Sequence, residues 1–103
     1  MCIRDSLWEI HEAFASQVLS TISNLENPDH LKKTGTKMDF GKLPTNKLNP
    51  NGSSIAIGHP FGATGSRVLS QAIKQLHSMG EGHKAIISVC ADGGLGTVML
   101  IQN

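Results

Sequence analysis

A glycine-rich segment placed directly before an amphipathic helix is the feature that most limits how this chain can fold. Residues 58–65 read GHPFGATG, and apolar residues recur behind them at helical spacing as far as Met79. Gly80 ends that helical pattern, and Thr64 or Ser66 is predicted to cap its start. A loop in this place offers backbone N–H groups and a helix dipole to an anion or an oxyanion. It is not a nucleotide-phosphate loop, because no Lys follows the last Gly and G-x-G-x-x-G is absent.

The elements before this loop are predicted from their periodicity. Residues 7–10 are typical of the end of a strand, and from Glu12 the pattern is helical until Pro28 stops it. Residues 29–50 form a long polar connection without a clear period, and residues 55–57 are too few to classify. One face of the first helix is predicted to carry Ile10, Phe14, Val18, Ile22 and Leu25.

Two strands are predicted to close the chain as a hairpin. Residues 85–89 indicate a buried strand, residues 91–94 a turn, and residues 97–101 the second strand. Two helices and one hairpin do not make a self-sufficient core, because an isolated hairpin is only marginally stable. The predicted fold class is therefore α/β, with these elements forming part of a larger sheet.

Composition and charge narrow the function classes. The 103 residues allow one domain, and a net charge of +1 leaves no electrostatic footprint for nucleic acid or a membrane surface. No apolar run reaches the roughly 20 residues that span a bilayer. The two cysteines, Cys2 and Cys90, lie far apart and do not form a disulfide framework, which favours a reducing compartment. Residues 1–6, MCIRDS, resemble a translated sequencing-adapter remnant, so we expect them to be a non-native leader.

Two side chains are the first candidates for chemistry. His59 lies between Gly58 and Pro60, and the proline favours extended backbone at His59, which directs the imidazole. It can serve as a general base or an oxyanion donor, or it can simply cap a turn. Cys90 ends an apolar strand at a turn; it is either a nucleophilic or acid–base thiol or a small buried hydrophobe. No metal site is predicted, because neither the five histidines nor Cys90 show ligand spacing.

Three segments together resemble the thiolase family. They are HEAFASQVL over residues 11–19, NPNGSSIAIGHPFGATGSR over residues 49–67, and CADGGLGTVML over residues 90–100. Their order and spacing match over residues 7–102. The combination of His-Glu-Ala-Phe with GHPFGATG is most similar to the β-subunit type of the fatty-acid oxidation trifunctional complex and its bacterial counterparts. The resemblance implies a layered αβα sheet, of which residues 7–103 are a partial carboxyl-terminal domain.

The resemblance also implies residue roles. His59 corresponds to the histidine that activates the nucleophilic cysteine and contributes to an oxyanion hole, and Cys90 to the cysteine that shuttles a proton at the acetyl-CoA carbon. His11 stands where an Asn usually orients a water in that hole. Asp92 departs from the usual Gly or Ala in a second oxyanion hole, where a carboxylate is unfavourable unless it points away. The implied substrate-binding residues are Phe14, Gly58, Phe61, Asp92 and Gly93.

The implied activity is CoA-dependent cleavage of 3-ketoacyl-CoA to acetyl-CoA and a shortened acyl-CoA in fatty-acid β-oxidation. Coenzyme A is then a substrate, and no separate cofactor is expected. The nucleophilic cysteine of the family lies in an amino-terminal half, and Cys2 is not in a matching context, so we expect this chain to be inactive alone. The alternatives are a biosynthetic acetyl-CoA acetyltransferase, which His11 disfavours, and a non-catalytic binding or assembly module.

The resemblance further implies where and with what the whole protein works. Partners would be the missing amino-terminal half and either a second copy, as a homodimer, or the subunits of a heteromeric β-oxidation complex. The expected location is the bacterial cytoplasm or the mitochondrial matrix. Acyl chain length and the direction of the reaction are not indicated by the residues.

Overall fold

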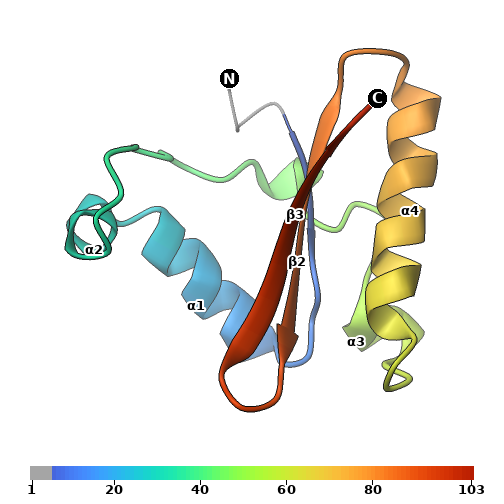
Figure 1. Cartoon of the computed structure of the whole chain (residues 1–103), viewed down its shortest axis with the longest axis horizontal. Helices are drawn as coiled ribbons and strands as arrows, with labels where there is room; N and C mark the ends of the chain where they lie inside the picture. The colour runs from blue at the N-terminus through green and yellow to red at the C-terminus, as the bar shows by residue number, and fades with distance from the viewer. Residues whose placement is uncertain (1–5) are drawn as a thin grey trace.

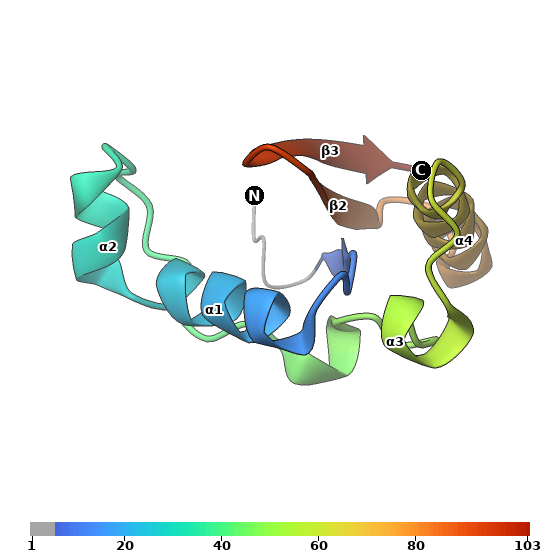
Figure 2. The ribbon, with the colours of Figure 1, turned by 90° about the horizontal axis from the view of Figure 1, so that it is seen from below.

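A three-stranded sheet with helices on both faces forms the protein, seen in a computed structural model that describes residues 6–103. Figure 1 shows α1 and α4 on opposite sides of the strands, and Figure 2 shows the same separation from below. The predicted αβα layering is therefore confirmed. In chain order the elements are β1 (Leu7–Ile10), α1 (Ala15–Leu25), α2 (Pro28–Lys33), a 3-10 turn (Thr45–Lys47), α3 (Ser54–Ile57), α4 (Thr64–Met79), β2 (Lys84–Ala91) and β3 (Leu95–Gln102).

The sheet order is β1-β2-β3. β1 pairs in parallel with β2, with Leu7 opposite Ala85, and β2 pairs antiparallel with β3 as the predicted hairpin. The added parallel strand gives the hairpin the third strand that it needs for stability. A parallel pair requires a long crossover, and the chain between β1 and β2 supplies it with all four α-helices.

Each face of the sheet has its own apolar cluster, because successive strand residues point to opposite sides. The α4 face joins Leu7, Ala85 and Ile87 to the buried stripe of α4, which consists of Val68, Ala72 and Leu76. The α1 face joins Trp8 and Ile10 to Val18 of α1 and to Leu43 of the long connection.

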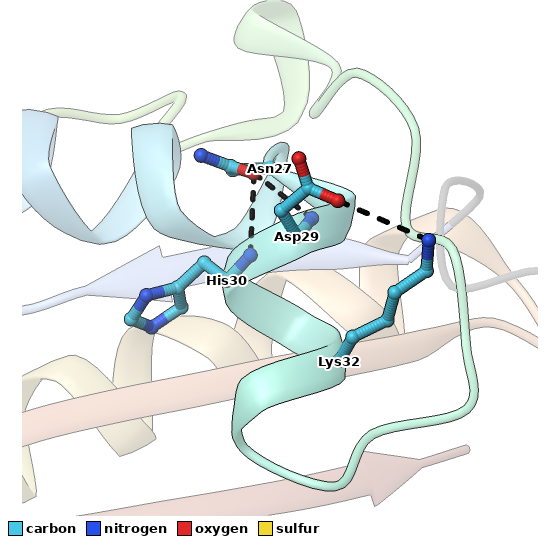
Figure 3. Close-up of polar contacts among 4 residues, drawn as sticks. All are labelled: Asn27, Asp29, His30 and Lys32. Carbon is cyan, nitrogen blue, oxygen red and sulfur yellow. Dashed lines mark hydrogen bonds and ion pairs between the residues drawn. The ribbon is translucent and has the colours of Figure 1, made fainter.

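Residues 29–50 are not the unstructured connection that the sequence predicted. α1 ends at Leu25, before Pro28, and Pro28 occupies the first turn of α2, where a missing N–H costs nothing. Figure 3 shows Asn27 capping this helix: its Oδ1 accepts from the backbone N–H groups of Asp29 at 3.0 Å and His30 at 3.2 Å. Lys32 lies 3.9 Å from the Asp29 carboxylate in an exposed ion pair.

Three further local predictions need correction. The first helix begins at Ala15 rather than Glu12, and Phe14 is 72% exposed, so it is not on the buried face. Neither Thr64 nor Ser66 caps α4: its N-cap is Ala63, without a side-chain bond. Residues 55–57, left unclassified, lie in the short helix α3.

The predicted non-native leader, residues 1–6, lies outside the described residues except at Ser6, which is buried, so it stays a prediction. Across residues 6–103, no helix is both long and apolar enough to cross a membrane.

Candidate active site

The predicted site residues meet at one end of the sheet. Three segments converge there: the residues that follow β1, the loop between α3 and α4, and the turn between β2 and β3 (Figure 1). Between them lies an open cleft of about 710 Å³. Every predicted site residue except Gly58 lines it, namely His11, Phe14, His59, Phe61, Cys90, Asp92 and Gly93.

His59 is held by the loop that carries it. Gly58 caps the end of α3, and its φ of 104° lies where any residue other than glycine is strained. It directs the chain into His59 and does not itself line the cleft. The His59 Nδ1 lies 2.7 Å from the Thr64 hydroxyl, and that hydroxyl donates to the Pro60 carbonyl at 3.0 Å. The ring lies 4.8 Å from the ring of Phe61, centroid to centroid. The structure thus fixes the Nδ1 side of His59 and leaves Nε2 for a ligand.

His11 follows β1 directly and is buried at 3% exposure. Its backbone N–H donates to the Ser88 carbonyl at 2.8 Å, and its Nδ1 lies 2.8 Å from the Ser54 hydroxyl. Arg67 of α4 donates from Nη2 to the same hydroxyl at 3.3 Å. The rings of His11 and His59 are 4.3 Å apart and tilted by 54°.

The charge state of His11 follows from its surroundings. Burial lowers its pKa below the ordinary 6.5, and the positive charges of His59 and Arg67 lower it further, while the Glu12 carboxylate opposes them. His11 is therefore a neutral imidazole at physiological pH.

Cys90 lies on the rim of the cleft, near the carboxyl end of β2. It is exposed, so the alternative of a buried hydrophobe is wrong. Gly93 and Gly94 turn the chain back with φ of 80° and 73°, and Cys90 pairs with Gly96 across the hairpin. This turn brings the Cys90 thiol to the cleft that His59 lines, which no local pattern in the sequence could establish.

The Asp92 carboxylate is turned onto its own loop. Asp92 Oδ1 accepts from the Gly93 backbone N–H at 2.8 Å. The N–H of Gly93 is therefore occupied, and it can serve a developing oxyanion only if the Asp92 side chain rotates away.

The polar side chains of Glu12 and Asn49 lie behind the cleft, and the sequence does not predict their hydrogen bonds. The Glu12 carboxylate accepts from the Asn49 side chain at 2.9 Å and from the Ile55 backbone N–H at 3.1 Å, which ties the segment after β1 to α3. Asn49 also accepts from the Ile10 backbone N–H at 2.8 Å. The available indication was that Glu12 and Asn49 lie within the resembling motifs, since their contacts depend on tertiary packing.

Glu9 is the most unusual of these groups. It is 1% exposed within β1, and its Oε1 has no hydrogen-bond partner among residues 6–103. Burial raises its pKa from 4.5 to about 7; the nearby Arg67 opposes this shift and Glu12 adds to it. A polar residue inside the apolar run of residues 7–10 was the sequence indication of such a group.

We expect Glu9→Gln to change the pH dependence of stability. Because the pKa of Glu9 is raised, the folded state binds its proton more tightly than the unfolded state does. The contribution of Glu9 to the free energy of unfolding is therefore complete below about pH 4.5 and is lost as the pH rises to about 7. The loss for one group with this shift is on the order of 3 kcal/mol. Denaturant unfolding from acidic to mildly alkaline pH should show the variant more stable than wild type at the alkaline end only. Parallel curves for the two proteins would contradict this origin of the pKa shift.

Among residues 6–103, no group of three or more His, Cys, Asp or Glu side chains is placed to hold a metal ion. The cleft instead combines two imidazoles, one thiol and a glycine-rich turn, and this set suits acid–base chemistry on a carbonyl compound.

Comparison with known proteins gives one consistent result. A family model described as "Thiolase, C-terminal domain" matches residues 4–103. A probable 3-ketoacyl-CoA thiolase of Caenorhabditis elegans is 42% identical over 100 residues, covering 93% of this chain and 21% of that protein. A 3-ketoacyl-CoA thiolase of Escherichia coli is 39% identical over 98 residues, covering 94% of this chain and 22% of that protein. The chain thus spans about a fifth of the length of these curated relatives.

Solved structures agree with the sequence matches. The peroxisomal 3-ketoacyl-CoA thiolase of Saccharomyces cerevisiae, described as five layers built from two core domains of identical topology, superposes with a TM-score of 0.67 at 30% identity. The alignment covers 97% of this chain and 24% of that one. A second structure, of the dimeric peroxisomal thiolase of the same yeast, superposes with a TM-score of 0.65. That alignment covers 97% of this chain and 21% of the yeast chain.

Proposed function

The chain belongs to the thiolase family, whose carboxyl-terminal domain it matches, and from this we propose that it is the carboxyl-terminal catalytic part of a degradative 3-ketoacyl-CoA thiolase. The observation that carries the proposal is the convergence of His11, His59 and Cys90 on one cleft. Acyl-CoA cleavage needs a base, a proton donor and oxyanion donors within reach of one substrate, and the cleft provides candidates for each.

The proposed reaction uses a cysteine that the family resemblance places in the amino-terminal half. His59 accepts the proton of that thiol at Nε2, and the thiolate attacks the 3-keto carbon. The bond between the second and third carbons breaks, and its electron pair stays on the acetyl-CoA carbon as an enolate. Cys90 protonates that carbon and becomes a thiolate. A CoA thiol then attacks the acyl-cysteine thioester and releases the shortened acyl-CoA, while its proton restores the resting state of the site.

The remaining cleft residues fit supporting roles. Phe14 and Phe61 stand at the wall with 72% and 88% exposure, so they offer apolar surface to an acyl chain or to a covering segment. The backbone N–H groups after Cys90 are the proposed donors to a thioester enolate, and the Asp92 carboxylate competes for the N–H of Gly93.

The alternative of a biosynthetic acetyl-CoA acetyltransferase uses the same chemistry in reverse. His11 disfavours the biosynthetic branch, and the relatives are named 3-ketoacyl-CoA thiolases, so we favour the degradative type. We further propose that the whole protein is a homodimer or part of a β-oxidation complex, which the dimeric yeast relative supports. It would use CoA as a substrate without another cofactor. A reducing location, the bacterial cytoplasm or the mitochondrial matrix, suits the exposed Cys90 thiol.

A chimera tests the proposal. Residues 7–103 would replace the matching carboxyl-terminal segment of the E. coli relative, which supplies the rest of the fold. We expect the chimera to cleave acetoacetyl-CoA in a CoA-dependent manner and residues 7–103 alone not to do so. Turnover by the isolated chain near that of the complete relative would contradict the assignment of the nucleophile to the other half.

A further inference from the structure

We propose that Thr64 and Ser54 are positioning residues that give His59 and His11 opposite neutral tautomers. His59 then presents a bare Nε2 to the cleft, while His11 presents an Nε2–H. The catalytic meaning of this arrangement rests on the proposed function, but the tautomers themselves follow from the hydrogen bonds on the two Nδ1 atoms.

The Thr64 hydroxyl has a single proton to give. Its oxygen lies 3.0 Å from the Pro60 carbonyl oxygen, and two oxygens at that distance repel unless a proton lies between them. The proton is therefore committed to Pro60. Toward His59 Nδ1, at 2.7 Å, the hydroxyl can only accept, so Nδ1 carries the hydrogen. The free nitrogen of neutral His59 is Nε2, which is the form that a general base requires.

The Ser54 hydroxyl is arranged the other way. Arg67 donates to it at 3.3 Å, and a guanidinium has no acceptor. Ser54 is 5% exposed, and within the described part of the chain its hydroxyl oxygen has no partner besides Arg67 and His11. A hydroxyl proton that did not point at His11 Nδ1 would be buried without an acceptor. It therefore goes to Nδ1, and neutral His11 keeps its hydrogen on Nε2.

The two rings complement each other in consequence. They are 4.3 Å apart, so a positive charge on one disfavours a positive charge on the other. When His59 takes a proton from the nucleophile, His11 remains neutral and still offers an Nε2–H. That hydrogen can bind a substrate carbonyl oxygen directly, or a water that passes the donation on. In both cases His11 acts as a donor, which is the polarity that an oxyanion needs.

Long-range 1H–15N correlation spectra of the histidine rings test the tautomers without any substrate. At about pH 8.5, where imidazoles of ordinary pKa are neutral, we expect Nδ1–H in His59 and Nε2–H in His11. His30 and His77 on the surface serve as internal references. The opposite tautomer in either ring, or averaged solvent-like shifts in both, would overturn the proposal. Because the wild-type spectrum decides this, a variant that fails to fold does not remove the test.

Matched variants then assign the cause. Thr64→Val removes the hydroxyl at similar volume and should convert His59 to a mixture containing Nε2–H, while Thr64→Ser should restore wild-type shifts. Ser54→Ala should move the His11 Nδ1 shift to that of an unbonded acceptor, and Ser54→Thr should move it back. Unchanged shifts in both Thr64→Val and Ser54→Ala would overturn the positioning roles.

Kinetics in the chimera separate this inference from the proposed function. Thr64→Val should lower kcat at least about tenfold with KM little changed, and Thr64→Ser should recover most of it. An inactive chimera with the expected tautomers would refute the proposed function and leave the tautomer assignment standing. An active chimera with the wrong tautomers would refute this inference alone.

Discussion

Replacing His59 with Ala in the chimera is expected to lower kcat for acetoacetyl-CoA cleavage by about 10²–10⁴-fold with KM changed only a few-fold. The reason is geometric: Nδ1 of His59 is held by Thr64, which leaves Nε2 as the proposed base in a cleft shared with Cys90. Loss of the imidazole removes both proton acceptance from the nucleophile and a donor to the oxyanion. Steady-state kinetics over a range of acetoacetyl-CoA concentrations give kcat and KM separately.

The matched control is His77→Ala, which removes an exposed imidazole from α4. It should leave both constants unchanged, and both variants should keep the circular dichroism spectrum of the parent. A His59→Ala chimera that is folded and retains more than about a tenth of the parent kcat would contradict the role assigned to His59.

Replacing Cys90 with Ala is expected to stop one half of the reaction and spare the other. Protonation of the acetyl-CoA carbon requires an acid at the rim of the cleft, where the exposed Cys90 lies. Cleavage of acetoacetyl-CoA should therefore fall by about 10²–10⁴-fold. Transfer of an acyl group between the nucleophilic cysteine and CoA breaks no C–C bond, so it should continue within a few-fold of the parent rate.

Two measurements on the same protein distinguish these halves. Deuterium exchange at the acetyl-CoA methyl group reports the proton shuttle and should be lost in Cys90→Ala. Exchange of labelled CoA into an acyl-CoA thioester reports acyl transfer and should persist. Loss of both exchanges together would show that Cys90 supports the whole site rather than the carbon protonation step.

The two candidate residues His59 and Cys90 were predictable because each lies in a short segment of restricted backbone. His59 is fixed between glycine and proline, and Cys90 lies between an apolar strand and a glycine turn, so local sequence identified both. Their common cleft was not predictable from local sequence, because it depends on the turn between β2 and β3 reaching the loop before α4.

The local errors have a shared physical origin. Pro28 was interpreted only as a stop, although a proline also suits the first turn of the next helix. The spacing of Phe14 predicts one face of the first helix, but the helix starts after it and leaves the ring at the cleft. The sequence predicts a cap at Thr64 and no histidine contact for Ser54, since the histidine partners of both hydroxyls are set by tertiary structure.

The most direct test of the central claim is the rate of CoA-dependent acetoacetyl-CoA cleavage by the purified chimera, measured beside the complete E. coli relative. If the cleft of His11, His59 and Cys90 is the carboxyl-terminal part of a thiolase active site, kcat/KM should lie within about 100-fold of the complete relative, and the His59→Ala version should be inactive by comparison. A chimera that is folded and assembled like its parent, yet shows no cleavage above the His59→Ala background, would contradict the account.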